Sequence, residues 1–572
     1  MKFKELAKYI EEIEKTSSRN KITEHLSSLF KKLSKDEIKE TIFLLQGRLV
    51  PLYESKEFGM AEKLIVNSAS VAFDLDKNKF NSELKKIGDI GSTVEHFKKK
   101  ITLKEEGLSI REVFEQLTSL AEAEGKGSQD VKIKVLADLI SKLDSLSTRY
   151  LVRIPIGAMR LGFSDMTILD SLSWMVTGDK SLRPLLEHSY HVKPNLGLIA
   201  TILKSKQGID VLKKIEPEVF TPIIMMRAER MSSGDEIIKK IGRCAVEPKY
   251  DGFRLQIHKK GNQVKMYSRN LDDVSHMYPD IIEGIIEQIK ETSVIIEGEA
   301  IGYNPNTGEY LSFQDTVQRK RKYDIDTMKI TIPLRLFVFD LLYLGGKSYI
   351  NQEFKKRREQ LEKLVKVSGN QIIDTILLAP QTIEDNGGNI EKRFDEAVSK
   401  NLEGIIAKKL DGIYKPGARE WNWIKFKKSY SSKIDDTIDC LIMGYDFGKG
   451  KRTGFGIGAF LAGVYDKKND YYVTVAKIGT GLTDKEWREL KKRSENKKVL
   501  KKPLIYMIND QIICDVWIKP LIVVEIKADE ITKSPLHSSG LALRFPRLER
   551  FRDDKLPSDV TSLDELRRLY TL

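Results

Sequence analysis

A lysine beside acidic and basic residues is the strongest candidate nucleophile in this sequence. Lys249 stands in the run Glu247-Pro-Lys-Tyr-Asp-Gly-Phe-Arg254, in which Asp251 and Gly252 favour a tight turn. A lysine attacks as the neutral amine, and a nearby cation such as Arg254 lowers the pKa of its ammonium group. The run therefore predicts covalent catalysis by Lys249, although on its own it also fits an exposed hairpin with ordinary charges.

Further charged and aromatic motifs follow this lysine in a fixed order. They are Glu297-Gly-Glu299, Phe339-Asp340, Glu403-Gly-Ile-Ile-Ala-Lys408, Trp423-Ile-Lys425-Phe-Lys427, Arg544-Phe-Pro-Arg547 and Arg552-Asp-Asp-Lys555. Lys425 and Lys427 alternate along a predicted strand and therefore face one side. Two ammonium groups there would stabilise charge on a phosphoryl group and disfavour protonation of Lys249. A solvated edge strand is the alternative for this pair.

The motif series resembles that of the covalent nucleotidyltransferases, in particular the ATP-dependent DNA ligases of the replicative type shared by archaea and eukaryotes. The resemblance covers essentially the whole chain, because residues 153–162 and 59–63 are similar to segments of the family's helical DNA-binding domain. It implies an enzyme that seals 5′-phosphate/3′-hydroxyl nicks in duplex DNA through lysyl-AMP and adenylated DNA, in replication, repair and recombination. It also implies ATP and Mg²⁺ as cofactors.

The resemblance assigns roles to individual residues. Glu299 would contact the AMP ribose and Glu403 would bind Mg²⁺, with Glu299 a second candidate metal ligand, while Glu297 could be an ordinary surface acid. Phe339 would stack on adenine, although Phe337 and Phe339 alternate on an apolar strand and at least one should belong to the core. The other candidate nucleotide-binding residues are Glu247, Arg254, Arg269, Lys408, Arg419, Lys425, Lys427, Arg544, Arg552 and Lys555. The segment that carries the last three would orient pyrophosphate during adenylation and then swing away, so that the C-terminal domain can grip DNA.

Hydrophobic periodicity divides the chain into a helical, a mixed α+β and a β-rich part, and the resemblance implies the DNA-binding, nucleotidyltransferase and OB-fold identities of these three domains. Residues 1–215 read as an all-α DNA-binding domain, with helical spacing in Lys35–Leu45 for example. Residues 216–430 read as an α+β nucleotidyltransferase domain that contains a hairpin, Phe253–His258 and Gln263–Tyr267. Residues 431–572 read as a small β-barrel of the OB-fold type, with Val516–Ala528 among its strands.

Composition limits the classes of protein to consider. The 572 residues carry 97 Lys and Arg against 83 Asp and Glu, a net charge of +14, and 41% of them are hydrophobic, which excludes a mostly disordered chain. Three cysteines without a CxxC pair exclude a disulfide scaffold and a four-cysteine zinc site, and indicate a reducing compartment. No apolar run approaches the ~20 residues that span a bilayer. We expect a cytoplasmic monomer, nucleoid-associated in a prokaryote, that binds nicked double-stranded DNA and no membrane.

Alternative functions stay open at this point. The same nucleotidyltransferase core serves RNA ligases and mRNA-capping enzymes, and a ligase-like scaffold could clamp DNA without catalysis. Against the last alternative, Lys249 and its carboxylates are all present. Many relatives carry a clamp-binding motif of Gln, apolar and paired aromatic residues, and residues 94–103 show no such motif. Binding to a sliding clamp is therefore left open.

Overall fold

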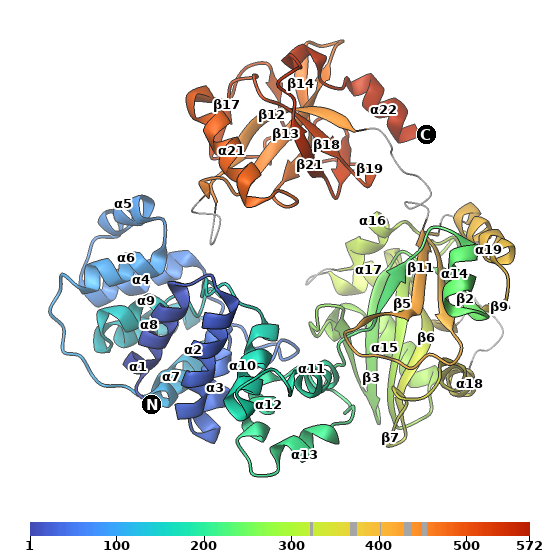
Figure 1. Ribbon diagram of the computed structural model, residues 1–572, viewed down its shortest axis with the longest axis horizontal. Helices are drawn as coiled ribbons and strands as arrows, with labels where there is room; N and C mark the ends of the chain where they lie inside the picture. Colours follow the sequence, from blue (N-terminus) through green and yellow to red (C-terminus); the bar gives the residue numbers. More distant parts are fainter. Residues whose placement is uncertain (321–323, 367–373, 401, 428–436, 449–454, 572) are drawn as a thin grey trace. The chain divides into compact units, whose positions relative to one another are not determined.

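A computed structural model describes residues 1–320, 324–366, 374–400, 402–427, 437–448 and 455–571 (Figure 1). The chain forms two compact units, unit 1 (Met1–Phe426) and unit 2 (Lys427–Leu572). In unit 1 helices come first and the strands follow from β1 (Arg227–Arg230) onward. The predicted boundary at residues 430–431 lies outside the described residues. None of the helices in the described ranges is long and apolar enough to cross a membrane.

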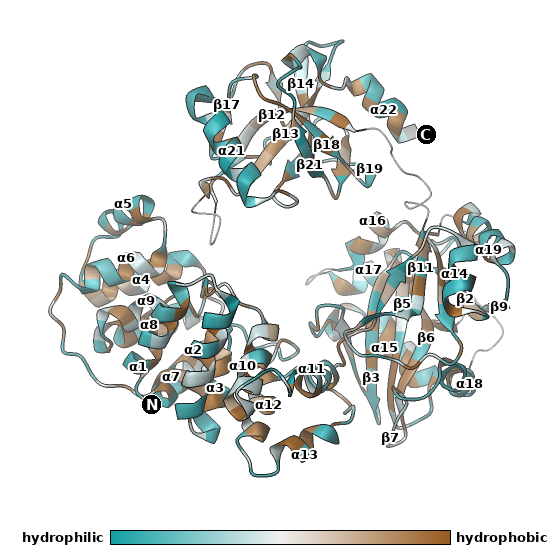
Figure 2. Cartoon of the chain, in the orientation of Figure 1, coloured by the Kyte–Doolittle hydropathy of each residue, from teal (hydrophilic) through white to brown (hydrophobic). Residues whose placement is uncertain are grey.

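The N-terminal part of unit 1 is helical, as periodicity predicted. In α3 (Lys35–Leu45) the Ser34 hydroxyl accepts a hydrogen bond from the Glu37 N–H, and the Glu37 carboxylate accepts one from the Ser34 N–H, which together cap the first turn. Apolar residues at helical spacing turn one face of each helix toward the core, so polar and apolar colours alternate along the helices in Figure 2. The other helices are α1 (Phe3–Glu14), α2 (Arg19–Lys32), α4 (Glu62–Phe73), α5 (Lys77–Ile87), α6 (Ile90–Lys98), α7 (Ile110–Glu122), α8 (Ser128–Lys142), α9 (Ser145–Leu151), α10 (Asp165–Thr177), α11 (Arg183–Val192), α12 (Leu196–Leu203) and α13 (Gly208–Lys213).

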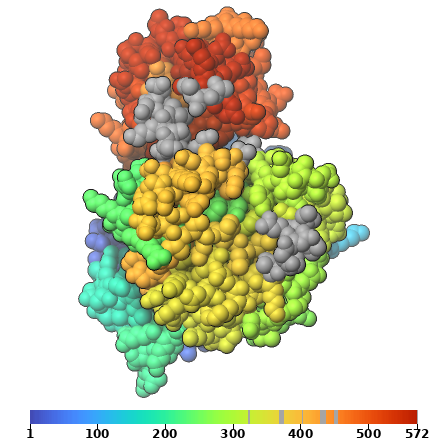
Figure 3. Space-filling model, turned by 90° about the vertical axis from the view of Figure 1, so that its right-hand side faces the viewer, coloured from blue at the N-terminus to red at the C-terminus, as the bar shows by residue number. Residues whose placement is uncertain are grey.

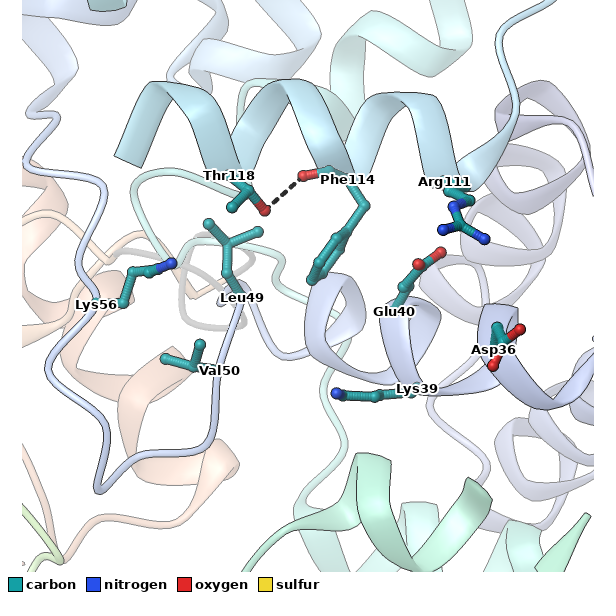
Figure 4. A pocket seen from close by; sticks show the side chains of 9 residues that line it. All are labelled: Asp36, Lys39, Glu40, Leu49, Val50, Lys56, Arg111, Phe114 and Thr118. Carbon is teal, nitrogen blue, oxygen red and sulfur yellow. Dashed lines mark hydrogen bonds between the residues drawn. The ribbon is translucent and has the colours of Figure 1, made fainter. Parts of the chain in front are cut away.

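A cavity of about 460 Å³ lies between α3 and α7 in this helical part (Figure 4). Its walls combine both signs of charge with an apolar patch, and the Glu40 carboxylate faces Arg111 across it. Burial raises the pKa of Glu40, and one of its oxygens has no hydrogen-bond partner. None of the predicted catalytic or nucleotide-binding residues lines this cavity.

Two sheets form the remainder of unit 1. The first has the strand order β1-β11-β10-β2-β9, with β1 and β11 parallel, and the second has the order β4-β3-β5-β6-β7, with β8 paired to β6. The bounds are β2 (Cys244–Lys249), β9 (Thr382–Glu384), β10 (Gly404–Lys409) and β11 (Arg419–Lys427) in the first sheet, and β3 (Phe253–Lys260), β4 (Gln263–Ser268), β5 (Ser293–Gly302), β6 (Leu334–Leu344), β7 (Lys347–Ser348) and β8 (Ile376–Leu378) in the second. The predicted hairpin is confirmed as β3 and β4, which Gly261 and Asn262 connect.

Each sheet buries one apolar face under helices and turns its other face toward the other sheet. The first sheet packs through Val246 and Ile405 on α14 (Gly234–Ile241) and α19 (Gly387–Ser399). The second packs through Leu255 and Leu336 on α15 (Pro279–Gln288) and α18 (Phe354–Leu364), and short helices α16 (Phe313–Thr316) and α17 (Ile325–Thr331) follow β5. Figure 3 shows the outside of this part, where the yellow-to-orange segment that contains α18 and α19 covers the face.

The facing sides of the two sheets are in contact. The Lys408 ammonium in β10 donates to the Phe339 carbonyl in β6 at 3.0 Å, and the Arg254 guanidinium in β3 lies 5.2 Å from the Trp423 ring in β11. These contacts join side chains from strands far apart in the sequence. The space between the sheets is therefore where residues from the separate motifs can meet.

Unit 2 is built on a curled sheet around a central strand, β12 (Ile438–Asp446). This strand pairs with β13, β17 and β18, and β13 continues to β14. The predicted single strand Val516–Ala528 is wrong, because the chain forms two strands that flank Pro520, a residue without an N–H to donate. The remaining elements are β13 (Ala459–Asp466), β14 (Tyr471–Ile478), α21 (Asp484–Ser494), β15 (Lys498–Val499), β16 (Tyr506–Met507), β17 (Val516–Ile518), β18 (Val523–Lys527), β19 (Glu530–Lys533), β20 (Leu541–Arg544), β21 (Arg547–Phe551) and α22 (Leu563–Thr571).

The three cysteines of the chain are buried and unpaired. Cys244 begins β2 in unit 1, Cys440 lies in β12, and Cys514 precedes β17 in unit 2.

Candidate active site

Lys249 is the last residue of β2, on the face that looks toward the second sheet. Its neighbour across the ladder is Gly404, and the Glu403 N–H donates to the Lys249 carbonyl at 3.1 Å. This pairing brings the Glu403 carboxylate onto the Lys249 ammonium, and the two groups form an ion pair. Their side chains are 21% and 24% exposed, so the pair remains accessible to a substrate.

The electrostatic surroundings of Lys249 act in opposite directions. Burial lowers the pKa of the Lys249 ammonium, and the cations Arg254 and Arg269 lower it further. The carboxylates of Glu299 and Asp251 and the ion pair with Glu403 oppose them, but the net direction is downward. A lower pKa increases the fraction of neutral amine, which is the form that attacks an electrophile.

Glu299 in β5 stands directly opposite Arg254 in β3. Burial raises the pKa of Glu299 to about 7, although Lys249, Arg254 and a hydrogen bond from the Gly252 backbone favour its charged form. The close approach of β5 to the residue before β3 explains why position 252 is a glycine. A Cβ atom on Gly252 would lie 2.2 Å from the Ala300 carbonyl oxygen, so only glycine fits there.

A group of cations surrounds Lys249 on the same side. Ile424 and Phe426 of β11 point into the core under α14 and α19, and Lys425 and Lys427 alternate with them. Burial lowers the pKa of Lys425 to about 8, and its charged neighbours Arg230, Lys249, Arg419 and Arg269 act in the same direction. The predicted common face of the two lysines is confirmed for the strand.

Arg269 and Arg419 lie at the outer edge of this cation group. Arg269 follows β4 and is exposed, and its pKa is lowered by partial desolvation and by the charges of Arg254, Arg227 and Arg419. Arg419 begins β11 opposite Arg227 of β1 and is also exposed. Neither side chain forms an ion pair with any of the described residues, so both remain available to an anion.

A second cluster lies deeper between the sheets. The Lys408 ammonium contacts the Glu247 carboxylate at 2.7 Å and lies 4.7 Å from the Phe339 ring and 4.8 Å from that of Trp423. Burial raises the pKa of Glu247 and lowers that of Lys408, against their mutual attraction. The Oε1 atom of Glu247 has no hydrogen-bond partner. Lys408 is thus held by protein groups, apart from the cations around Lys249.

Of the two alternating phenylalanines, Phe337 is the core residue. Its ring stacks on Tyr250 with centroids 4.2 Å apart and is 4% exposed. Phe339 is only half-buried and lies 5.5 Å from the Arg254 guanidinium. The expectation that at least one of the two belongs to the core is confirmed.

Sequence reasoning missed a buried polar network beside Arg254. Glu297 is 0% exposed, so its interpretation as a surface acid is wrong. It accepts hydrogen bonds from Arg254 at 2.7 Å, Gln256 at 3.1 Å and Tyr414 at 3.0 Å. Burial and the charge of Glu297 raise the pKa of Tyr414 well above its usual value, so its hydroxyl stays protonated. Tyr414 lies in the segment between β10 and β11 and carries no motif that could have revealed its role.

The predicted C-terminal cations lie in unit 2, where carboxylates hold Arg552 and Lys555. Arg552 contacts Asp554 at 2.7 Å and Asp439 at 3.0 Å, and Lys555 contacts Asp439 at 2.5 Å. Arg544 ends β20 and is exposed, with its guanidinium 5.6 Å from the Phe545 ring. Asp439 therefore brings Arg552 and Lys555 together on one surface.

Comparison with known proteins identifies the family of this chain. Three family models match, described as DNA ligase N terminus (residues 2–173), ATP dependent DNA ligase domain (225–427) and ATP dependent DNA ligase C terminal region (453–555). The chain is 44% identical to a probable DNA ligase of Dictyoglomus turgidum and 37% identical to a DNA ligase of Sulfolobus acidocaldarius. Both alignments cover 100% of this chain, and 97% and 98% of the relatives.

One similar solved structure supports the fold over nearly the whole length. It is titled Pmar-Lig_PreS3, has a TM-score of 0.57 at 18% identity, and the match covers 96% of this chain and 99% of that one. At this identity the likeness concerns the fold alone. The full-length relatives and the three family models decide the assignment: the chain belongs to the ATP-dependent DNA ligases, enzymes that join breaks in DNA.

Proposed function

We propose that Lys249 is the residue on which this ligase carries AMP. Its Nζ atom would attack the α-phosphorus of ATP, so that a P–N bond forms, the P–O bond to pyrophosphate breaks and Nζ loses a proton. AMP would then pass to the 5′-phosphate of a nick, and the 3′-hydroxyl would displace it. The observation that carries the proposal is the accessible Lys249 ammonium, whose pKa is lowered and which is flanked by carboxylates and cations.

The residues between the sheets fit the nucleotide of ATP. The Nε atom of Arg254 is buried without a hydrogen-bond partner, and a bound nucleotide could satisfy such a group. The Oε1 atom of Glu247 instead lies 3.9 Å from the Arg358 guanidinium of α18. The half-buried Phe339 ring would stack on adenine. Arg254, Arg269, Arg419, Lys425 and Lys427 would hold ribose and phosphate oxygens, and Lys408 would position Glu247 and Phe339 from behind.

The carboxylates beside Lys249 fit Mg²⁺. Mg²⁺ in nucleotide enzymes usually takes one or two carboxylates and completes its shell with water and phosphate oxygens. Glu403 and Glu299 would supply these two carboxylates, and water and phosphate oxygens would complete the shell. Among the described residues there is no group of three or more His, Cys, Asp or Glu residues that could hold a metal ion without such ligands. When bound, Mg²⁺ would neutralise charge on the phosphate oxygens.

We also propose an OB-fold and a mobile role for the C-terminal part. The central strand β12, with partners on both sides, supports a barrel. The proposed boundary at residue 215 lies where helices give way to strands, and the proposed boundary at residue 430 lies outside the described residues, shortly after unit 1 ends at Phe426. Arg544, Arg552 and Lys555 would orient the pyrophosphate leaving group. The enzyme would bind nicked duplex DNA as a monomer, and a sliding clamp is a possible further partner without a recognised motif.

The test is adduct formation and sealing by the Lys249→Ala variant. With labelled ATP and Mg²⁺ we expect no covalent AMP adduct and no sealing of a nicked duplex. Lys265→Ala is the matched control, since Lys265 lies in β4 with a surface ion pair to Asp273 at 3.4 Å. A stable AMP adduct in Lys249→Ala would contradict the assignment of the nucleophile.

A further inference from the structure

Arg254 belongs to a closed ring of hydrogen bonds that no catalytic motif contains as a whole. The Tyr414 hydroxyl donates to Glu297 at 3.0 Å, and Glu297 accepts from Arg254 at 2.7 Å. Arg254 also donates to the Met226 carbonyl at 2.8 Å, and the Met226 N–H donates to the Tyr414 hydroxyl at 2.9 Å. Four residues from four separate segments therefore fix one another.

Most of the ring is buried, and an aromatic side chain packs against it. Tyr414 is 1% exposed and Met226 and Glu297 are 0% exposed, whereas the Arg254 side chain is 20% exposed, so Arg254 is the member of the ring that reaches the accessible site. The Tyr414 ring packs edge-on against Trp423 with centroids 5.8 Å apart. In such surroundings a hydrogen bond to a charged group is strong and directional.

One member of the ring, Arg254, lies on the side of the sheets that carries Lys249. Arg254 is one of the cations that act on Lys249, and its guanidinium lies 5.5 Å from the Phe339 ring. Met226 directly precedes β1, whose residues pair with the start of β11 and with Lys425. The Tyr414 hydroxyl and the Arg254 guanidinium each contact both Glu297 and Met226, so the hydroxyl holds both partners of Arg254.

We propose that Tyr414 is a positioning residue for adenylation, which acts through its hydroxyl by holding Glu297, and with it Arg254, and by fixing Met226 at the start of β1. The inference rests on the proposed function of Lys249. The Tyr414 hydroxyl would act through its partners, because its two hydrogen bonds go to Glu297 and Met226.

The first variant is Tyr414→Phe, which removes the hydroxyl and keeps the ring. We expect the single-turnover rate of lysyl-AMP formation at saturating ATP to fall about tenfold, the effect of one hydrogen bond to a charged group. The ATP concentration for half-saturation should change less than threefold, because Arg254 keeps its charge and loses only its fixed orientation. An unchanged rate, or a change confined to half-saturation, would overturn the proposal.

The matched control is Tyr150→Phe in the helical part. Tyr150 is 0% exposed and donates to Glu14 at 2.8 Å, and Glu14 also accepts from Arg153 at 2.8 Å, so it repeats the Tyr–Glu–Arg arrangement far from Lys249 in sequence. Both variants should lower the melting temperature by roughly 2–4 °C. Only Tyr414→Phe should slow adenylation. Equal slowing in both variants would reduce the role of Tyr414 to stability.

A double-mutant cycle with Glu297→Gln separates positioning from independent effects. Since both residues act through one ring, Tyr414→Phe/Glu297→Gln should be no slower than the slower single variant. If the rate losses of the two single variants multiply in the double variant, Tyr414 and Glu297 act independently, which would contradict the proposal that Tyr414 acts through Glu297. If Glu297→Gln does not fold, the comparison of Tyr414→Phe with Tyr150→Phe still decides. The wild-type adduct on Lys249 is measured in the same assay, so failure of the proposed function is seen separately.

Discussion

At the scale of single residues, the site combines a nucleophile that should be neutral with neighbours that should be charged. Lys249 and Lys425 both lie among cations, and the pKa of each ammonium is lowered. For Lys249 this helps, because attack needs the free amine. For Lys425 it is a cost, because a lysine that holds phosphate oxygens must keep its proton.

The pKa of about 8 for Lys425 predicts how the use of ATP depends on pH. As the pH rises through that value, the free enzyme loses a positive charge that attracts phosphate, so kcat/KM for ATP in adenylation should decline. Lys425→Arg should abolish the decline, because a guanidinium stays charged throughout.

The control for this prediction is Lys409→Arg. Lys409 ends β10 and pairs with Asp411 at 3.3 Å, so the same substitution there should leave the decline in place. The measurement is kcat/KM for adduct formation between pH 6 and 10. If the decline of kcat/KM persists unchanged in Lys425→Arg, the titration of another group causes it.

At the scale of elements, the approach of β3 to β5 holds Glu299 and Lys249 in place. Gly252→Ala would put a Cβ atom 2.2 Å from the Ala300 carbonyl oxygen, and backbone on both sides would have to shift. We expect a loss of about 1–3 kcal/mol in the free energy of unfolding and at least a tenfold slower adenylation, measured by denaturation and by adduct formation. Gly388→Ala is the control, because a Cβ atom there would lie 3.6 Å from Asn386 Oδ1, which is an ordinary contact distance. If Gly252→Ala and Gly388→Ala form the AMP adduct at equal rates, the close approach of β3 to β5 has no role in adenylation.

The two cations that follow β21, Arg552 and Lys555, lead to a prediction that separates the steps of the reaction. Asp439 holds Arg552 and Lys555 on one surface of unit 2, as expected for cations that act together. Arg552→Ala and Lys555→Ala should slow adenylation of Lys249 at least tenfold while sealing of pre-adenylated nicked DNA changes less than threefold. Gel assays of the two steps measure this difference, and equal losses would contradict a role in pyrophosphate release.

Local patterns explain why some elements could be predicted and others not. Lys35–Leu45 carries its own cap and periodicity, and the Phe253–Tyr267 hairpin has its turn residues between two strands, so both follow from adjacent residues. The strand at 516–528 failed because apolar content continues through Pro520, where pairing stops. Tyr414 and Met226 are 188 positions apart, and their contact depends on the whole of unit 1.

The same distinction applies to the site. Alternation in β11 is local and correctly predicted a shared face for Lys425 and Lys427. The pairing of Lys408 with Glu247 depends on the register between β10 and β2, which residue types do not specify. For this reason the sequence could not distinguish a lysine that contacts phosphate from one enclosed by aromatic rings.

At the scale of the whole molecule, the net charge of +14 predicts binding that depends steeply on salt. Contacts to phosphates release counterions from DNA, so log Kd should rise linearly with log salt concentration. For six or more contacts, affinity for a nicked duplex should fall by about 10³ between 50 and 200 mM salt. Fluorescence anisotropy at several salt concentrations measures the slope, and a flat dependence would contradict a ligase that follows the backbone.

The burial of all three thiols has a practical consequence for studies of motion. Burial raises the pKa of Cys244 and of Cys514 to about 12, and Cys440 is 0% exposed, so none of them should react with maleimide dyes in the folded enzyme. A cysteine introduced at Ile330, 77% exposed, or at Leu504, 96% exposed, would react instead. The natural chain thus serves as its own unreactive background for fluorescence energy transfer between the two units as ATP and DNA bind.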